Sequence, residues 1–321
     1  MIQVQVLKLS VPNTTIWITG AKGFIGRHLA LYLTRQGHKV YGIGHGLWPS
    51  IEAATWGLEG WINGEIDAPN LEVLRQASGI PSVVFHLAGG SSVGSSLANP
   101  SEDFSRTVTT TARLVEWLRI SAPDARLVAV SSAAVYGARH NDSIKETSPP
   151  QPFSPYGHHK LMMEQLCRSY SEAFGLRCAV VRLFSVYGPW LRKQLLWDVC
   201  CKLAGGAKVL QLGGSGGELR DWVEIRDVVR LLGLAASIDS DDLVLLNGGS
   251  GIGAPVATVA ALVVEAWGEP IPIEFTGEGR RGDPFSLVAC SNALVGNPFT
   301  WEIELAAGIA NYVRWFKEAR I

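Results

Sequence analysis

The sequence predicts an α/β fold built on a parallel, doubly wound sheet. Short β-rich runs alternate with segments of helical apolar spacing through the first 185 residues, and a glycine-rich turn joins the first run to the first helix. Apolar residues make up 47% of the 321-residue chain, enough for a large core. Strands that alternate with helices form βαβ units, and right-handed crossovers then place those strands in one parallel sheet.

The elements of this sheet follow one another regularly. We expect strands at residues 15–19, 39–43, 82–87, 125–131 and 178–184, and helices at 27–36, at 103–120 and from Pro155 onward. We expect Gly37 to end the first helix. We expect Ser154 to be the N-cap of the helix from Pro155 onward, with Pro155 as its first residue. Beyond residue 184 the pattern loosens, and glycine-rich stretches at 205–217 and 248–253 indicate loops of a smaller lobe.

Composition and charge exclude several classes of protein. The net charge of −1 creates no field that would attract nucleic acid or an anionic membrane. No apolar run reaches the ~20 residues of a membrane span, and residues 1–13 are interpreted as an extension without a signal-peptide layout. The five cysteines lack metal-ligand spacing, so we expect reduced thiols, no metal and a cytoplasmic protein.

Gly20, Gly23 and Gly26 stand between the first strand and the first helix with the spacing G-x-x-G-x-x-G. The first glycine permits a tight turn, the second lets the backbone approach a pyrophosphate, and the third lets the helix pack on the strand. The helix N-terminus favours the phosphate charge. The turn, which also contains Phe24 and Ile25, therefore predicts a dinucleotide cofactor, NADP or NAD.

The end of the second strand bears on which dinucleotide is bound. A carboxylate is expected there to bind the adenosine ribose of NAD, but Gly44 occupies the position. Lys22 and Arg27 are placed to meet a 2′-phosphate, which slightly favours NADP; alternatively both cations are solvated and NAD binds without this carboxylate. Glu65 and Ile66 are expected near the adenine edge.

Tyr156 and Lys160 are four residues apart on a predicted helix and therefore lie on one face. A phenol has a pKa of about 10, and a neighbouring ammonium lowers that pKa because it stabilises the phenolate. The pair is thus suited to proton transfer, although Tyr-x-x-x-Lys also arises by chance on solvated helix faces.

Ordered segments along nearly the whole chain are similar to the motifs of one enzyme family. They are residues 19–26 (TGAKGFIG), 86–89 (HLAG), 131–137 (SSAAVYG), 182–189 (RLFSVYGP), 220–223 (RDWV) and 281–283 (RGD). On these segments the chain resembles an extended short-chain dehydrogenase/reductase, the family of nucleotide-sugar epimerases, dehydratases and reductases. The resemblance implies a Rossmann-type dinucleotide-binding lobe and a smaller α/β lobe that binds the substrate.

The resemblance implies a role for each matching residue. Ser132 would hydrogen-bond the reacting oxygen of the sugar, Tyr156 would be the general acid/base, and Lys160 would hold the nicotinamide ribose and lower the pKa of the tyrosine. The segment passing under the cofactor would contain Leu87, Ala88 and Gly89.

Arg220 is implied to bind the substrate diphosphate, and arginine does make bidentate hydrogen bonds to phosphate. The alternative for Arg220 is an ion pair with Asp221 or Glu224. Arg281 is the weaker candidate for the nucleotide end of the substrate.

Several positions depart from the family pattern. Sugar 4,6-dehydratases carry an Asp-Glu pair where this chain has Ala133 and Ala134, so no side chain there can move a proton and elimination of water is disfavoured. Ser185 stands where an asparagine is usual and is expected, with Ser91, to contact the substrate. Cys290 replaces a usual acidic residue.

Two reactions remain open. In a nucleoside-diphosphate-sugar 4-epimerase, Tyr156 takes the proton of the C4 hydroxyl while hydride passes to the nicotinamide; the 4-keto sugar then rotates and hydride returns to its other face. A 4-keto-6-deoxy-sugar reductase would use the same three residues with NADPH, which Gly44 and Lys22 favour. A non-catalytic nucleotide-binding sensor is a third hypothesis, disfavoured by the intact Ser132, Tyr156 and Lys160.

We expect residues 1–185, with about 222–248 and 301–321, in the dinucleotide-binding lobe, and about 186–221 and 249–300 in the substrate lobe. The substrate, a nucleoside-diphosphate sugar, is expected in the cleft between them at the carboxyl ends of the strands. By analogy with the family, a homodimer would form through helices at about 101–119 and 156–174.

Overall fold

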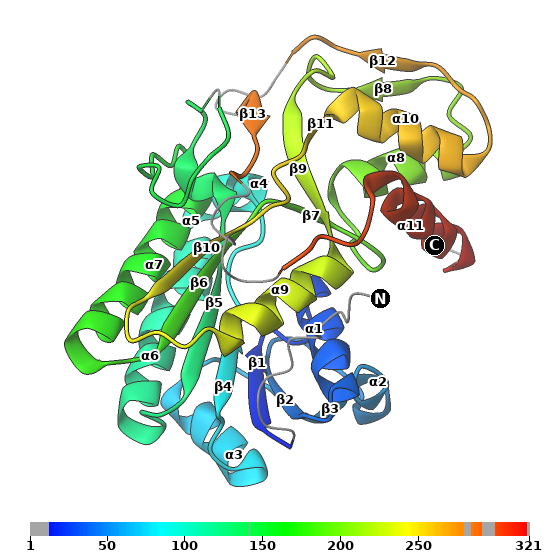
Figure 1. Ribbon diagram of the computed structural model, residues 1–321. Helices are drawn as coiled ribbons and strands as arrows, with labels where there is room; N and C mark the ends of the chain where they lie inside the picture. Colours follow the sequence, from blue (N-terminus) through cyan, green and yellow to red (C-terminus); the bar gives the residue numbers. More distant parts are fainter. Residues whose placement is uncertain (1–12, 141, 279–283, 291–298, 320–321) are drawn as a thin grey trace, which may run out of the picture. The chain divides into compact units, whose positions relative to one another are not determined.

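The computed structural model describes residues 13–140, 142–278, 284–290 and 299–319 (Figure 1). The chain divides into two compact units. Unit 1 runs to Val135 and includes Pro152–Arg182 and Val229–Leu246; unit 2 comprises Tyr136–Gln151, Leu183–Val228 and the chain from Asn247 onward. Each unit is described by itself below.

Unit 1 is built on a seven-stranded sheet in the order β10-β6-β5-β4-β1-β2-β3 (Figure 1). Its strands are β1 (Thr15–Thr19), β2 (Lys39–Gly44), β3 (Leu58–Asn63), β4 (Val83–His86), β5 (Arg126–Ser132), β6 (Cys178–Leu183) and β10 (Val244–Gly248). The strands from β3 to β5 pair in parallel. The order reverses between β1 and β4, which is where such sheets bind ligands at their carboxyl edge. The predicted fold class is confirmed.

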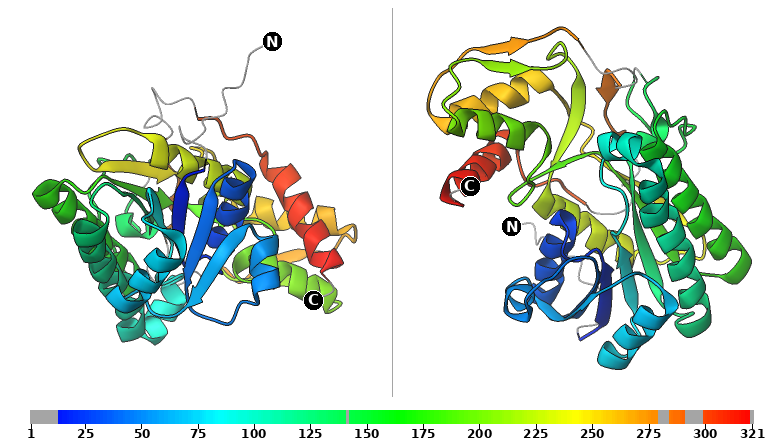
Figure 2. Two further views of the ribbon diagram at one scale, coloured as in Figure 1. Left: turned by 90° about the horizontal axis from the view of Figure 1, so that it is seen from below. Right: turned by 180° about the vertical axis from the view of Figure 1, so that it is seen from behind.

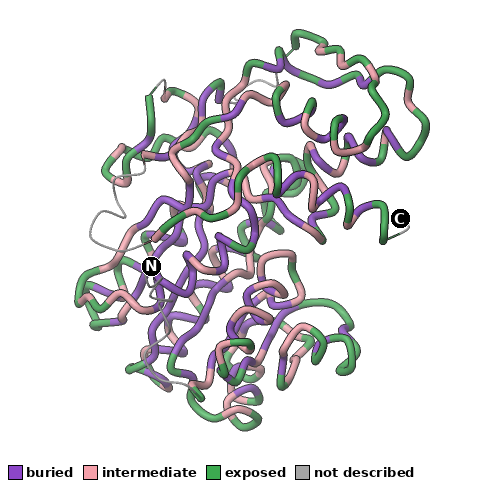
Figure 3. Tube along the Cα trace, turned by 45° about the vertical axis from the view of Figure 1, so that its right-hand side comes forward, coloured by how far each residue is buried: buried purple, intermediate pink, exposed green. Residues whose placement is uncertain are grey.

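Helices cover both faces of this sheet (Figure 2). They are α1 (Phe24–Arg35), α2 (Ser50–Thr55), α3 (Ala68–Ser78), α4 (Val93–Ala98), α5 (Pro100–Phe104), α6 (Thr110–Ser121), α7 (Pro155–Phe174) and the later part of α9 (Ile225–Ser237). The core beneath α3, α6 and α7 includes Trp17 of β1, whose ring lies 5.1 Å from that of Trp117. The strands are buried along most of their length, whereas helices expose their outer faces (Figure 3).

The predicted helix at 103–120 is divided in the structure. A π-helical turn, Ser105–Thr109, separates α5 from α6. Threonine hydroxyls bond backbone carbonyls here: Thr110 Oγ1 donates to Arg106 O at 2.5 Å and Thr111 Oγ1 to Thr107 O at 2.6 Å. Such bonds bend helices, and π turns are frequent at functional sites. This turn sets the position of Asp103 and Thr107 on the segment that follows β4.

Unit 2 is a smaller α/β assembly. In its main sheet β9 (Leu219–Glu224) pairs with β7 (Ser185–Tyr187), β11 (Gly253–Pro255) and β13 (Ser286–Leu287), and β8 (Leu210–Leu212) pairs separately with β12 (Ile273–Phe275). Its helices are α8 (Gln194–Ala204), α10 (Val256–Trp267) and α11 (Leu305–Glu318).

The C-terminal helix α11 belongs to unit 2, which differs from the expected division. Its Phe316 ring lies 5.2 Å from Trp197 of α8 and 6.0 Å from Trp267 of α10, and Lys317 Nζ donates to Trp267 O at 2.7 Å. Residues 222–228 and 136–151, both expected in the first lobe, also group with unit 2. The aromatic contacts of Phe316 account for the place of α11 in unit 2.

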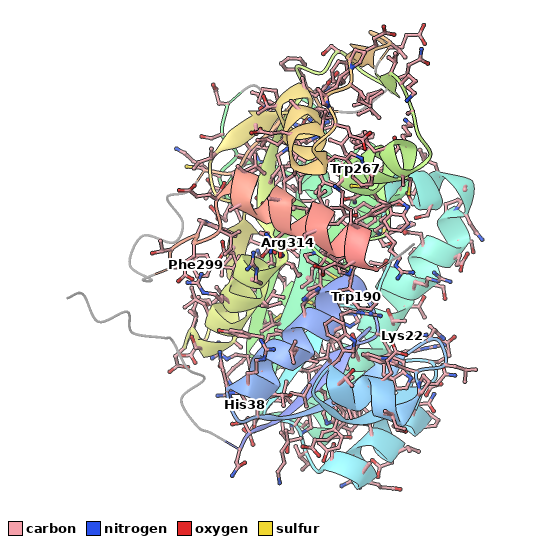
Figure 4. The ribbon with its side chains drawn as sticks, turned by 90° about the vertical axis from the view of Figure 1, so that its right-hand side faces the viewer. Lys22, His38, Trp190, Trp267, Phe299 and Arg314 are labelled. Carbon is pink, nitrogen blue, oxygen red and sulfur yellow. The ribbon has the colours of Figure 1, made fainter. Side chains whose placement is uncertain are left out.

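His38, labelled in Figure 4, is buried in the turn before β2, and neither ring nitrogen has a hydrogen-bond partner. Burial lowers its pKa from 6.5. Because the folded-state pKa lies below the unfolded value, the unfolded chain takes up the proton first, so stability is lost as pH falls below about 6.5.

His38→Leu is therefore expected to raise the free energy of unfolding at pH 5.5 by about 1 kcal/mol, and by less at pH 7.5. Urea titrations at the two pH values measure the difference. His158→Leu, at an exposed position of α7, is the control and should leave the pH dependence unchanged. Equal effects of His38→Leu at both pH values would contradict the titration argument.

Candidate functional site

The glycine loop forms a cradle that only glycine permits. Gly20 has a φ of +71°, and a β-carbon there would lie 3.0 Å from Ala88 N. A β-carbon on Gly26 would lie 2.5 Å from Gly20 O. Gly23 precedes α1, and no side chain caps that helix. The first N–H groups of α1 therefore have no side-chain cap, an arrangement that suits the phosphates of a dinucleotide.

The segment after β4 is fixed against β1 by a buried histidine. Thr19 Oγ1 bonds His86 Nδ1 at 2.8 Å and accepts from Ala88 N at 3.2 Å, and His86 Nε2 bonds Thr111 Oγ1 at 2.9 Å. Burial, and to a smaller extent Lys160, lower the pKa of His86 to about 3, so the ring is neutral. This contact places Leu87 and Ala88 beside Gly20 of the glycine loop.

Gly44 closes the other side of the cradle. It has a φ of +155°, and a β-carbon on it would lie 3.4 Å from Gly20 N. Lys22 (Figure 4) reaches this edge, where its Nζ donates to Leu47 O at 2.6 Å. Glu65, which follows β3, lies 3.5 Å from His45. The predicted cofactor residues of β2 and β3 thus meet at one edge, and Ile66 beside them is buried.

Arg27 is held in place rather than simply solvated. Its NH2 group donates to Lys22 O at 2.8 Å, and its guanidinium lies 5.1 Å from the ring centroid of Trp56 and 5.7 Å from that of Trp48. Stacking of this kind orients the cation. The alternative of a freely solvated Arg27 is not what the structure shows.

Ser132, Tyr156 and Lys160 converge at the carboxyl end of β5. Ser154 caps α7, its Oγ accepting from Gly157 N at 3.2 Å, which sets the start of the helix that carries Tyr156. The Ser132 hydroxyl bonds the Tyr156 phenol, and Lys160 Nζ donates to Val130 O at 2.9 Å. The structure therefore assembles the three residues that the sequence placed in two separate segments.

The expected lowering of the Tyr156 pKa is not found in this structure. Burial raises the pKa of Tyr156 above 10.0; the hydrogen bond from Ser132 lowers it, and Asp103 raises it further. Burial also lowers the pKa of Lys160 to about 8, and its ammonium is directed to Val130 O. The prediction from helix spacing was wrong in direction because it considered the charge of Lys160 without the burial of either group.

A buried ion pair lies beneath these residues and was not predicted. Arg182 of β6 binds Glu164 of α7 through Nε at 2.9 Å and NH2 at 2.6 Å, and Ser131 Oγ donates to the same carboxylate at 2.5 Å. Glu164 stands one helical turn after Lys160. An arginine within an otherwise apolar strand and a glutamate four residues after Lys160 were signals that could have found it.

The predicted substrate residues are distributed over both units. Ser91 lies exposed in the loop after Gly90. Ser185 and Arg220 belong to β7 and β9 of unit 2, and Arg220 donates to Leu219 O at 2.8 Å. Arg281 lies outside the described residues.

The alternative partners of Arg220 are engaged elsewhere. Asp221 is buried and accepts hydrogen bonds from Ser250, Gly251 and Ala289, while Glu224 lies 3.0 Å from Arg226 Nε. These contacts occupy both oxygens of Asp221 and one oxygen of Glu224, whereas Glu224 Oε1 is buried without a hydrogen-bond partner among the described residues.

Residues 16–242 match the family model "NAD dependent epimerase/dehydratase family". The chain belongs to this family. Among curated members, it is 31% identical to a UDP-glucose 4-epimerase of Corynebacterium glutamicum, over 85% of this chain and 86% of the relative. It is also 31% identical to the UDP-glucose 4-epimerase of Azospirillum brasilense, over 85% and 83%.

Solved structures of the epimerase/dehydratase family resemble it closely. MoeE5 in complex with UDP-glucuronic acid and NAD is 30% identical, with a TM-score of 0.84 over 95% of this chain and 99% of that chain. The UDP-glucuronic acid 4-epimerase of Bacillus cereus in complex with UDP-glucuronic acid and NAD is 25% identical, with a TM-score of 0.85 over the same shares. Among the described residues of this chain, no helix is both long enough and apolar enough to cross a membrane.

Proposed function

We propose that this protein is a UDP-sugar 4-epimerase that uses a nicotinamide dinucleotide. The observation that carries the proposal is the convergence of Ser132, Tyr156 and Lys160 beside the glycine cradle. Relatives at about 30% identity are UDP-sugar 4-epimerases, and MoeE5 binds UDP-glucuronic acid together with NAD. The relatives therefore support the substrate class, and the three converging residues support the reaction.

The residues of this chain have distinct tasks in the proposed reaction. Tyr156 removes the proton of the C4 hydroxyl and later returns it, and Ser132 holds the same sugar oxygen by a hydrogen bond. Lys160 holds the nicotinamide ribose. The bound cofactor supplies the hydride acceptor and donor at C4, together with a positive charge that favours the phenolate. Small residues at 89–92 leave room for the 4-keto sugar to turn.

Ala133 and Ala134 support epimerisation over dehydration. They directly follow Ser132, where elimination of water across C5 and C6 would require an additional acid and base. Ala133 is 1% exposed and neither side chain can transfer a proton. The proposed chemistry is accordingly confined to one sugar carbon.

The edge beside Gly44 supports a second candidate, an NADPH-dependent 4-keto-6-deoxy-sugar reductase. No carboxylate at Gly44 repels a 2′-phosphate, and Lys22 is held beside the adjoining residues 46 and 47. We propose NAD as the cofactor of the epimerase because MoeE5 binds it. The edge formed by Gly44 and Lys22 would also accept the 2′-phosphate of NADP. Arg220 is proposed to bind the substrate diphosphate.

We also propose a homodimer formed through the helices at about 101–119 and 156–174. Exposed apolar side chains on these helices support it: Phe104 is 42% exposed, Met162 40% and Phe174 56%. A dimer interface would remove these side chains from water.

Cofactor content and product analysis test the proposed function together. Protein purified without added cofactor is expected to release NAD⁺ on denaturation and to interconvert the C4 epimers of UDP-glucose or UDP-glucuronic acid without net NADH formation. Chromatography of the nucleotides and absorbance of the reduced nicotinamide give both measurements. Cofactor-free protein that consumes NADPH with a 4-keto-6-deoxy nucleotide sugar, and epimerises neither substrate, would establish the reductase instead.

A further inference from the structure

Asp103 and His159 form a buried pair next to the catalytic residues. His159 Nδ1 lies 2.6 Å from Asp103 Oδ2, and the side chains are 12% and 4% exposed. His159 stands on α7 between Tyr156 and Lys160, whereas Asp103 comes from α5, just before the π-helical turn. The pair therefore connects the catalytic helix to the segment after β4.

The carboxylate of Asp103 lies against the backbone at Gly90, in the segment that follows β4. A β-carbon on Gly90 would lie 1.8 Å from Asp103 Oδ1, so only glycine fits beside it. Gly90 N donates to Thr107 Oγ1 at 2.8 Å, and a β-carbon on Gly89 would lie 3.2 Å from Lys160 Nζ. Asp103 and the Lys160 ammonium thus border the same two-glycine segment.

We propose that Asp103, oriented by His159, is a positioning residue whose carboxylate sets the pH range in which Tyr156, with Lys160 beside it, transfers a proton. Neither Asp103 nor His159 contacts the Ser132 or the Tyr156 hydroxyl. Asp103 therefore acts on the proton transfer through its charge, which favours the protonated forms of Tyr156 and Lys160. The expected change in the pH profile of kcat rests on the proposed epimerase function. The expected change in the titration of Tyr156 does not, because it requires no turnover.

Asp103 differs from the other charges around the site. Glu164 is bound by Arg182 in a bidentate pair, so its charge is largely compensated. Asp103 instead has a histidine as its partner, and its carboxylate favours the protonated forms of both Tyr156 and Lys160. A carboxylate buried beside titratable groups is weak evidence for stability and is more typical of a functional site.

Three elements supply the remaining groups around Tyr156 and Lys160. On α7, Glu164 and Cys167 act on Lys160 in the same direction as Asp103. From β4, the neutral His86 faces Lys160, and from β5 the Ser132 hydroxyl bonds Tyr156. A substitution of Asp103 changes none of these groups; among the neighbours discussed, only His159 loses its carboxylate partner.

Asp103→Asn keeps the shape of the side chain and a hydrogen-bonding atom for His159 while it removes the charge. Both limbs of the profile of kcat against pH are expected to move to lower pH by at least about half a unit, because both pKa values fall. Glu102→Gln is the matched control: it removes the same charge from the adjacent residue, which forms an exposed pair with Arg106. Its profile should coincide with that of the wild type.

A second measurement does not depend on turnover. Phenolate absorbance is titrated in the cofactor-bound Asp103→Asn and unsubstituted proteins, and the curve of each protein's Tyr156→Phe counterpart is subtracted to isolate Tyr156. A Tyr156 titration at lower pH in Asp103→Asn supports the proposal even if no sugar is epimerised. An unshifted Tyr156 titration in Asp103→Asn would overturn the proposal. So would a profile in which kcat falls together with the melting temperature while both limbs stay at the same pH.

Discussion

Tyr156→Phe is expected to lower kcat by about 10²–10⁴-fold while the protein still binds its cofactor. The substitution removes only the phenol oxygen, so no group remains to take the C4 proton. The glycine loop, His86 and Lys160 stay in place. Initial rates of epimerisation measure kcat, and release of NAD⁺ from the denatured variant measures cofactor retention.

Tyr170→Phe is the matched control for this substitution. Tyr170 lies on the same helix α7, but its hydroxyl donates to Glu116 Oε2 at 3.0 Å on the side of α6. Its loss should leave kcat close to that of the unsubstituted protein. Turnover of Tyr156→Phe at more than about a tenth of the normal rate would show that another group transfers the proton.

Arg182→Met is expected to produce the largest loss of stability, about 3–5 kcal/mol in the free energy of unfolding. Arg182 and Glu164 are both buried, and removal of the arginine leaves the Glu164 carboxylate with the single donor Ser131. Urea or thermal unfolding gives the magnitude. The substitution removes the compensating charge from the layer directly below Ser132 and Lys160.

Arg119→Met provides the comparison at an exposed position. Arg119 binds Glu116 with the same bidentate geometry, through Nε at 2.9 Å and NH2 at 2.7 Å, but the two side chains are 36% and 43% exposed. Water replaces the lost partner there, so we expect a much smaller change. The double variant Arg182→Met, Glu164→Met should recover part of the stability lost in Arg182→Met. Similar losses at the buried and exposed sites would refute the role of burial.

Local patterns accounted for much of the fold. The strands at 15–19, 39–43 and 178–184 agree with β1, β2 and β6 to within one residue. Helical apolar spacing also predicted α1 and α7, because an apolar face, a capping serine and a terminal glycine are all local signals. The strand β3 was missed because glycine and glutamate interrupt its apolar residues.

The candidate site was predicted only as far as its residues lie in recognisable segments. Ser132, Tyr156 and Lys160 were found, as were the glycines of the cradle. The pairs Asp103–His159 and Glu164–Arg182 were not, because each joins residues of two different elements; only Arg182 within its apolar strand and Glu164 one turn after Lys160 gave a signal, and that for the second pair alone. The direction of the Tyr156 pKa was also missed, since burial is a property of the folded chain.

Short-range patterns were enough to predict the doubly wound architecture, the glycine loop after β1 and the family. Those features depend on short-range patterns: strand and helix periodicity, glycines that allow a close approach, and a tyrosine and a lysine one helical turn apart. Three features came from packing in space: α11 in unit 2, the stacking of Arg27 on two tryptophans, and the buried carboxylate of Asp103 near Tyr156 and Lys160. Charge, burial and aromatic packing act through space, so their effects appear only once distant segments have been brought together.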